Sequence, residues 1–321
     1  MSNASEISEQ VARESDRRRR LSVPAFACGF LYLLSGIVIS ETLKGAPTVG
    51  LLQGIGPALS GVGNPAVSPR AAEVKFISHH SLPLVAGSLV AAFAIVGLTL
   101  VLLLLVDATR FRRPESWRLA RPLVLFGGVA VALVSIFHQV LSAYLTHKFV
   151  VGHDFSAHAV ELALTKGTAN VLSDYLDLLA GFALAAGMIV TMLGTMRVGL
   201  LPRWVGVLGI FTGVLIFLPI GGATLELVPA FWLVMMGMLY AERWPGGDPP
   251  AWPSGEARPW PSRADQRAAA AAVAGEEAPG GAGVNVGAPA LGGANGSSSG
   301  GSSGKRKRRR GARSGEGQRP E

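Results

Sequence analysis

The chain has 321 residues, of which 49% are hydrophobic and 16% are charged, with a formal net charge of +8. Soluble domains carry roughly a quarter charged residues, so this balance argues against a soluble globular protein. The single cysteine, Cys28, excludes an intrachain disulfide and a metal site built from several cysteines.

The apolar residues are concentrated in six long blocks that lack the charged face of an amphipathic helix. Each block has about 17 to 26 residues, the length that a tilted helix needs to cross roughly 30 Å of hydrocarbon. The blocks are 23–40, 83–106, 122–145, 171–196, 204–220 and 224–240. We therefore predict an all-α fold in which residues 21–241 form a polytopic bundle of six transmembrane helices.

Residues 1–20, before the first block, are polar and basic and are predicted to be disordered. Arginine-rich segments also join blocks two and three, join blocks four and five, and follow block six. The opposite side carries only Lys44, Arg70, Lys75, Lys148 and Lys166. By the positive-inside rule this is a multi-pass protein of the cell membrane with both termini in the cytoplasm.

The first outer segment, 41–82, is rich in glycine and proline. Near its end, Ser68 followed by Pro69 fits an N-cap serine with proline at the first helical position. This pattern predicts a helix that continues directly into the second block.

All six histidines lie in the third block, at the outer end of the second block, or in the outer loop 146–170. Imidazoles gathered on one side are candidate zinc or copper ligands, and the loop offers His147, His153 and His158. Their spacing lacks a second ligand pair, and loop histidines are often only solvated. No metal is assigned, and no cofactor is predicted.

Two carboxylates, Asp174 and Asp177, stand in the apolar stretch LSDYLDLLAG at the outer end of the fourth block. A carboxylate costs about 2.5 to 3.5 kcal/mol at the centre of a membrane helix, so it usually faces the bundle interior or water. Both acids share a helical stripe with Gly181 and other small residues, which marks a packing face. The remaining circumference, predicted to face lipid, carries Leu176, Leu179, Phe182, Val190 and Leu193.

His138, in the third block, lies at a similar depth on a stripe with Gly127, Ser135 and Ser142. We predict that His138 and Asp177 are neighbours in the outer half of the bundle, with Asp174 nearer the mouth. Two interpretations stay open. The pair is either an interhelical bond worth about 0.6 kcal/mol, or a site that titrates or binds a ligand.

Further polar residues stand at the outer ends of the blocks, namely His79 and His80 before the second block and Glu226 at the start of the sixth. Together with His138, Asp174 and Asp177, they are the candidate ligand-binding or proton-titrating residues. This set predicts an outward-facing polar pocket for a small molecule.

From residue 242 the composition turns to Pro, Gly, Ala and Ser and ends in a basic hexamer, Lys305 to Arg310. Such a segment buries too little apolar surface to offset its ordering entropy, so 242–321 is predicted to be disordered. The hexamer is expected to contact anionic lipid headgroups, at roughly 1 kcal/mol per residue near the surface. No stacking aromatics accompany it, which argues against nucleic acid.

The basic N-terminus followed by FLYLLSGIVIS, together with GLLPRWVGVLGIFTGVL before the last block, resembles a family of uncharacterised six-helix integral membrane proteins of high-GC bacteria. The resemblance covers Leu21 to Tyr240. It implies the six-helix layout, and no activity or site residue follows from it.

Three classes of function are open. The first is an integral membrane protein whose outer pocket serves small-solute binding, sensing or transport. The second is a metal-dependent membrane hydrolase, which needs three convergent ligands from His138, Asp174, Asp177 and the loop histidines. The third is a structural or accessory membrane protein without pocket chemistry.

Overall fold

The computed structural model describes residues 2–50, 67–115, 118–218, 223–245, 247–260 and 267–268. The chain divides into two compact units, Met1–Gln266 and Arg267–Glu321, and only two helical residues of the second are described. The basic hexamer and nearly all of the predicted tail thus lie outside the described residues. Every regular element within the described ranges is a helix, which confirms the predicted all-α class.

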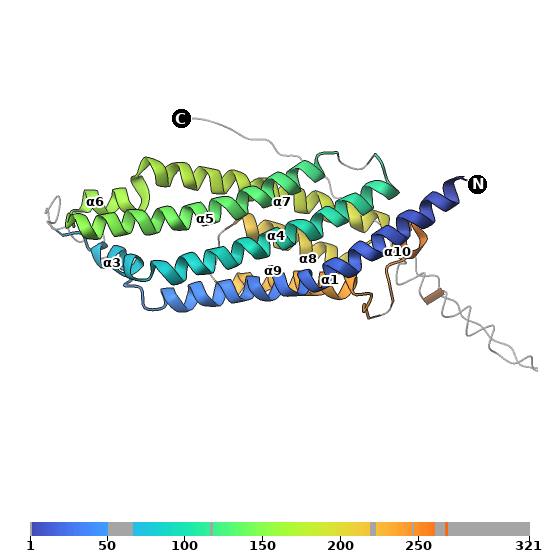
Figure 1. Ribbon diagram of the computed structural model, residues 1–321, viewed down its shortest axis with the longest axis horizontal. Helices are drawn as coiled ribbons and strands as arrows, with labels where there is room; N and C mark the ends of the chain where they lie inside the picture. The colour runs from blue at the N-terminus through green and yellow to red at the C-terminus, as the bar shows by residue number, and fades with distance from the viewer. Residues whose placement is uncertain are drawn as a thin grey trace, which may run out of the picture. The chain divides into compact units, whose positions relative to one another are not determined.

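Four stretches of helix are long and apolar enough to cross a membrane (Figure 1). Their principal helices are α1 (Ser2–Leu43), α4 (Ser81–Arg112), α5 (Ala120–Gly152) and α7 (Thr168–Val198). The fifth and sixth predicted blocks form two shorter apolar helices, α8 (Arg203–Phe217) and α9 (Ala223–Tyr240). Each predicted block therefore coincides with a helix.

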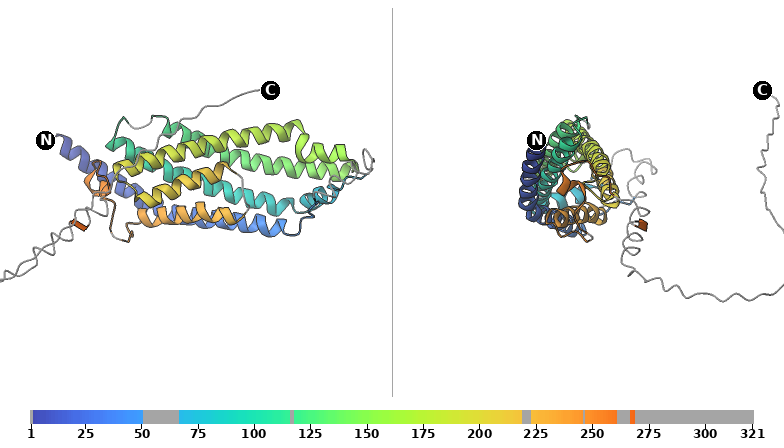
Figure 2. Two further views of the ribbon diagram at one scale, coloured as in Figure 1. Left: turned by 180° about the vertical axis from the view of Figure 1, so that it is seen from behind. Right: turned by 90° about the vertical axis from the view of Figure 1, so that its right-hand side faces the viewer.

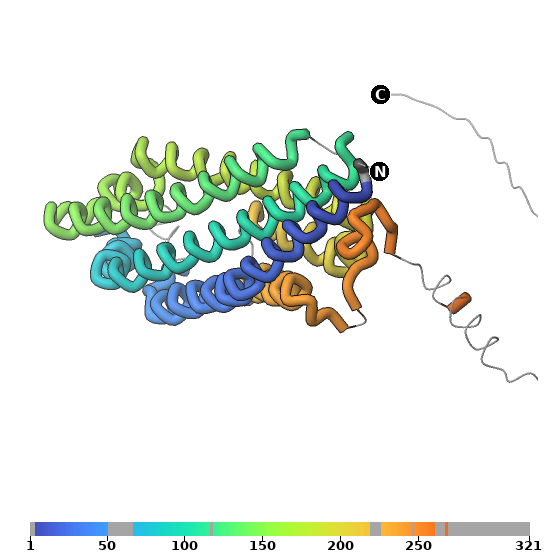
Figure 3. The backbone as a smooth tube through the Cα atoms, turned by 45° about the vertical axis from the view of Figure 1, so that its right-hand side comes forward, coloured from blue at the N-terminus to red at the C-terminus, as the bar shows by residue number. Residues whose placement is uncertain are grey.

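Six helices follow one another around a ring, in the order α1, α4, α5, α7, α8 and α9, and α9 packs back along α1 (Figure 2). The tube in Figure 3 shows the same helices running side by side along the bundle. We call the end where α1 begins and α4 ends the inner end of the bundle, and the opposite end the outer end.

The main core fills the inner part of the ring and includes two large aromatic residues with no exposed surface, Trp232 and Tyr240. Their polar atoms are satisfied by carbonyls of other helices. Trp232 Nε1 donates to the oxygen of Val205 at 3.2 Å, and the Tyr240 hydroxyl donates to the oxygen of Val101 at 2.9 Å. These bonds fix α9 against α8 and α4.

A second, smaller core closes the outer end, where Val74, Phe149 and Val160 pack together. It joins α5 to the short helices α3 (Ala71–His79), α6 (Ala157–Glu161) and η1 (Leu162–Lys166). The helix is interrupted at His80, which lies between α3 and α4. The single helix predicted to continue from Ser68 into the second block is therefore two helices.

Large apolar side chains also cover the outside of the ring. Leu176, Leu179 and Phe182 are 40%, 58% and 58% exposed and face away from the bundle as predicted. Val190, predicted to face lipid with them, instead packs against the main core. Phe93, Phe126 and Phe211 are exposed on other helices. A water-soluble monomer rarely exposes so much apolar surface, whereas a membrane would cover it.

The prediction that residues 1–20 are disordered is wrong, because this segment is the first part of α1. Glu14 and Arg18 on its inner face are only 4% and 3% exposed. Arg112 of α4 donates to Glu14 at 2.8 Å, and its side chain is fully buried. Two of the charges that suggested a solvated segment, Glu14 and Arg18, are instead buried and paired with other parts of the chain.

The predicted start of the disordered tail at residue 242 is also wrong. Residues 247–260, which we call the strap, contain α10 (Ala251–Ser254) and pack across the inner ends of the helices. Trp252 is 3% exposed, donates to the oxygen of Leu200 at 3.0 Å, and lies under the guanidinium of Arg18 at 4.4 Å. The strap thus joins the main core through Trp252, although its Pro/Gly-rich composition did not predict buried residues.

Candidate functional site

The candidate site is built around one contact between α5 and α7. His138 Nδ1 lies 3.1 Å from Ser173 Oγ and 3.7 Å from Asp174 Oδ1. The side chains of His138 and Asp174 are 47% and 62% exposed, so the rest of the chain does not shield them. Asp174 is thus the carboxylate that His138 contacts across the two helices. The sequence had predicted Asp177 in this place, with Asp174 nearer the mouth.

Close packing of α5 on α7 sets the register that brings these side chains together. A Cβ at Gly127 would lie 2.6 Å from Leu184 Cα, and one at Gly187 would lie 2.8 Å from Val124 N. The two backbones approach this closely only because neither glycine carries a side chain. His138 and Ser173 follow on the same interface three turns farther out.

Asp177 lies on α7 one turn from Ser173 and one turn from Gly181. Ser173 faces α5, while Gly181 approaches the backbone of Phe217 at the end of α8, so Asp177 points between these two directions. The described part of α8 ends beside Gly181, and Asp177 is exposed one turn beyond it. It lies within electrostatic range of both His138 and Asp174.

Glu226 occupies the opposite side of the ring, where α9 meets α1. A Cβ at Gly36 would lie 2.5 Å from Glu226 Cδ, so the carboxylate rests directly on the α1 backbone. Its Oε2 is buried and makes no hydrogen bond. Tyr32, one turn away on α1, lies within electrostatic range of it.

These groups share one depth in the bundle, which we call the outer polar layer: His138, Ser173, Asp174, Asp177 and Glu226. From Arg121 to His138 the helix rises roughly 25 Å, and from Arg20 to Gly36, which faces Glu226, roughly 24 Å. A hydrocarbon core is about 30 Å thick, so in a membrane-spanning bundle the layer would lie near the outer boundary of the span. The cost of placing charge there is correspondingly small.

The other predicted site residues do not join this layer. His79 ends α3 with an exposed side chain, and His80 stacks on Phe76 and places Nδ1 2.9 Å from its carbonyl oxygen. His153 places Nδ1 2.6 Å from the oxygen of Val151. Within the described ranges, no three His, Cys, Asp or Glu side chains form a group able to hold a metal ion. His147 and His158 are therefore not part of such a group either.

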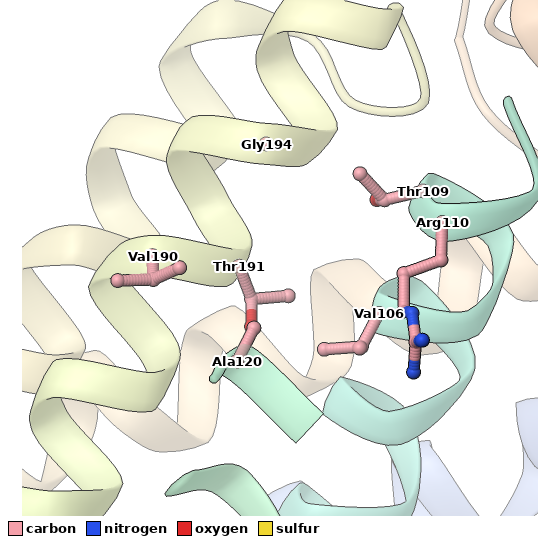
Figure 4. A pocket seen from close by; sticks show the side chains of 7 residues that line it. All are labelled: Val106, Thr109, Arg110, Ala120, Val190, Thr191 and Gly194. Atoms are coloured by element: carbon pink, nitrogen blue, oxygen red, sulfur yellow. The ribbon is translucent and has the colours of Figure 1, made fainter. Parts of the chain in front are cut away.

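A small cavity lies near the inner end, between α4, α5 and α7 (Figure 4). Its volume is about 20 Å³, and its lining is mostly apolar apart from Thr109, Arg110 and Thr191. A cavity of that size holds about one water molecule. It is therefore too small for a solute and lies far from the outer polar layer.

Ser173 is the site residue that the sequence did not single out. Its signal is positional, because it precedes Asp174 and lies one helical turn before Asp177 on the α5 side. Comparisons with protein-family models, curated proteins and solved structures gave no match to this chain.

Proposed function

We propose that the chain is a six-span membrane protein with both termini in the cytoplasm. Four long apolar helices, the exposed apolar exterior and the one-sided distribution of arginine support this topology. Trp204 and Trp244 pack together at 5.6 Å near the inner end, where an interfacial aromatic pair is expected. The resemblance to six-helix membrane proteins agrees with the same layout.

Within this topology, we propose that the outer polar layer binds a small cationic solute from outside the cell. The observation that carries the proposal is the exposed contact of His138 with Asp174, with Asp177 beside it. The two carboxylates of Asp174 and Asp177 outnumber the one imidazole at this contact, so a positive charge is the complementary ligand. Binding is the activity proposed, and sensing or transport would follow from it.

A thermal-shift titration with small ammonium compounds, from methylammonium to putrescine, tests this in detergent-purified protein. We expect the midpoint temperature to rise with the concentration of at least one compound, because a ligand that binds only the folded state stabilises it. Asp174→Asn and Asp177→Asn should each abolish that rise. Glu115→Gln is the matched control, since it removes an exposed carboxylate at the inner end.

Equal shifts in the aspartate variants and the control would contradict this site, as would the absence of a shift with every compound. A metal-dependent hydrolase remains an alternative, but no ligand set within the described residues favours it. The basic hexamer from Lys305 to Arg310 remains a proposed contact for anionic headgroups. Vesicle binding by protein with and without residues 305–310 would test that contact.

A further inference from the structure

A second cavity, of about 280 Å³, lies at the inner end between residues 11–19 of α1 and the strap. Two arginines, two carboxylates, a serine and the buried tryptophan of the strap form most of its wall. They are Ser15, Arg18, Arg19, Glu242, Asp248 and Trp252. The cavity is many times larger than one water molecule and has room for a small polar ligand.

Arg18 is the buried charge of this wall, with only 3% of its side chain exposed. Its Nη2 donates to the oxygen of Leu239 at 2.7 Å, and its Nη atoms lie 3.3 and 3.4 Å from Asp248. Charge-assisted bonds are usually about 2.7 to 2.9 Å long, so the contact with Asp248 is loose. Arg18 Nε is buried without any hydrogen-bond partner.

The ion pair of Arg19 with Glu242 is also long enough for a ligand to replace it. Arg19 Nη2 donates to Glu242 at 3.2 Å, and Ser15 Oγ donates to the other carboxylate oxygen at 3.1 Å. The side chains of Glu242 and Asp248 are 30% and 29% exposed. Both carboxylates are therefore accessible from the cavity side while still facing an arginine.

The charges of the wall cancel, and this limits the ligand. A simple anion would meet two carboxylates, and a simple cation would meet the buried guanidinium of Arg18. A ligand carrying both charges would replace each loose ion pair with two new ones, its anion on Arg18 and Arg19 and its ammonium on Glu242 and Asp248. The ring of Trp252 lies against the guanidinium of Arg18 at 4.4 Å and so helps to hold that charge at the cavity wall.

We propose that this cavity binds a phosphate ester that bears a primary ammonium group, the chemistry of phosphoethanolamine. Arg18 and Arg19 lie just before the span that starts near residue 23, at the level where inner-leaflet headgroups are expected. The ligand is thus either the headgroup of phosphatidylethanolamine or a free zwitterion of the same chemistry. The proposal does not depend on the function of the outer polar layer.

Native mass spectrometry of the full-length protein in detergent tests this with phosphatidylethanolamine, phosphatidylglycerol and phosphatidylcholine. We expect phosphatidylethanolamine to bind about tenfold more tightly than phosphatidylglycerol, the effect of one charge-assisted hydrogen bond. Phosphatidylcholine should also bind weakly, because its quaternary ammonium has no N–H to donate. Glu242→Gln should remove the preference, because it removes a partner of the ammonium. Arg19→Gln should weaken the binding of all three lipids, because each carries the phosphate.

Arg13→Gln is the matched control, because Arg13 pairs with Glu9 on the exposed side of α1, away from the cavity. It should keep the preference for phosphatidylethanolamine. Soluble O-phosphoethanolamine separates the two sources, since binding of this compound without the lipid identifies a free ligand. Equal binding of all three lipids, equal binding of inorganic phosphate and O-phosphoethanolamine, or the same loss in Arg13→Gln would overturn the proposal.

Discussion

At the residue scale, the exposure of His138 and Asp174 limits how much their contact contributes to the stability of the fold. Both side chains are about half exposed, and ion pairs in such positions contribute roughly 0.2 to 1 kcal/mol. A double-mutant cycle with His138→Ala and Asp174→Ala should therefore give a coupling free energy below about 1 kcal/mol in chemical unfolding. A coupling of several kcal/mol would contradict this expectation and would mean that the pair is shielded from solvent.

Glu242 gives a second test at this scale, through pH. Burial alone would raise its pKa, but hydrogen bonds from Arg19 and Ser15 and the nearby charges lower it below its ordinary value of 4.5. A lowered folded-state pKa stabilises the fold above the unfolded-state pKa and loses that contribution as pH falls through the folded-state value. The stability difference between wild type and Glu242→Gln should thus be constant above about pH 5.5 and shrink below pH 4.5.

Thermal unfolding of both proteins between pH 3 and pH 7 would measure this difference. Arg19→Gln removes one of the bonds that lowers the pKa of Glu242, so the acid-dependent difference should be smaller in that background. A difference that grows as the pH falls would have the wrong sign and would contradict the assignment of this ion pair.

At the scale of elements, the packing of α5 on α7 makes Gly127 a sensitive position. An added Cβ would lie 2.6 and 2.8 Å from backbone atoms of Leu184 and Ala183, which have no side-chain freedom to yield. Gly127→Ala should destabilise the bundle by about 1 to 3 kcal/mol, although alanine favours a helix by about 1 kcal/mol over glycine. Gly152→Ala, with open space around it, should be neutral or stabilising.

The strap gives the second test at this scale. Deleting residues 267–321 removes only the second compact unit, so the midpoint temperature of the bundle should not change. Deleting everything after Pro249 also removes Trp252 and should lower it clearly. Trp252→Ala alone should cost about 3 to 5 kcal/mol, as expected for a buried tryptophan. Equal stability of the two truncated proteins would show that the strap does not pack on the bundle.

The elements show which features sequence patterns predict. Within the described residues all six apolar blocks lie on helices, the structure expected of apolar segments of that length if they cross a membrane. The strap and the start of α1 were missed, because composition averages over a segment whereas burial depends on single residues such as Trp252 and Glu14. Two tryptophans within nine residues of a Pro/Gly-rich segment, Trp244 and Trp252, were the available signal.

The outer polar layer was predicted in part, and for a similar reason. Helical stripes place Asp177 and His138 on inward faces, but the choice of partner depends on the rotation and register of two helices. The rotation and register of α5 and α7 are fixed by close contacts at Gly127 and Gly187. The effect of these glycines on register cannot be predicted from a single sequence. A shift of one residue in register decides between Asp174 and Asp177 as the partner of His138.

At the scale of the whole molecule, the number of spans depends on the pair α8 and α9. The 15 residues of α8 rise roughly 22 Å, less than the 30 Å or so of a hydrocarbon core. A re-entrant hairpin that turns inside the membrane would fit α8 by itself. The start of α9 favours a full crossing, because Glu226 faces Gly36 at the depth of the outer polar layer.

Labelling of single cysteines with a membrane-impermeant maleimide in intact cells distinguishes the two topologies. Cys28 is the only native cysteine and is buried, so Cys28→Ser gives the background. Asp154→Cys, in the outer loop, and Leu218→Cys, after α8, should both react from outside. Glu115→Cys should react only after permeabilisation.

Reaction at residue 154 without reaction at residue 218 would indicate four spans and a re-entrant hairpin, with the termini still on one side. Reaction at residue 115 from outside would reverse the topology and place the outer polar layer in the cytoplasm. The proposed solute would then have to come from inside the cell. The orientation measured at residue 115 therefore decides from which side the contact of His138 with Asp174 is reached.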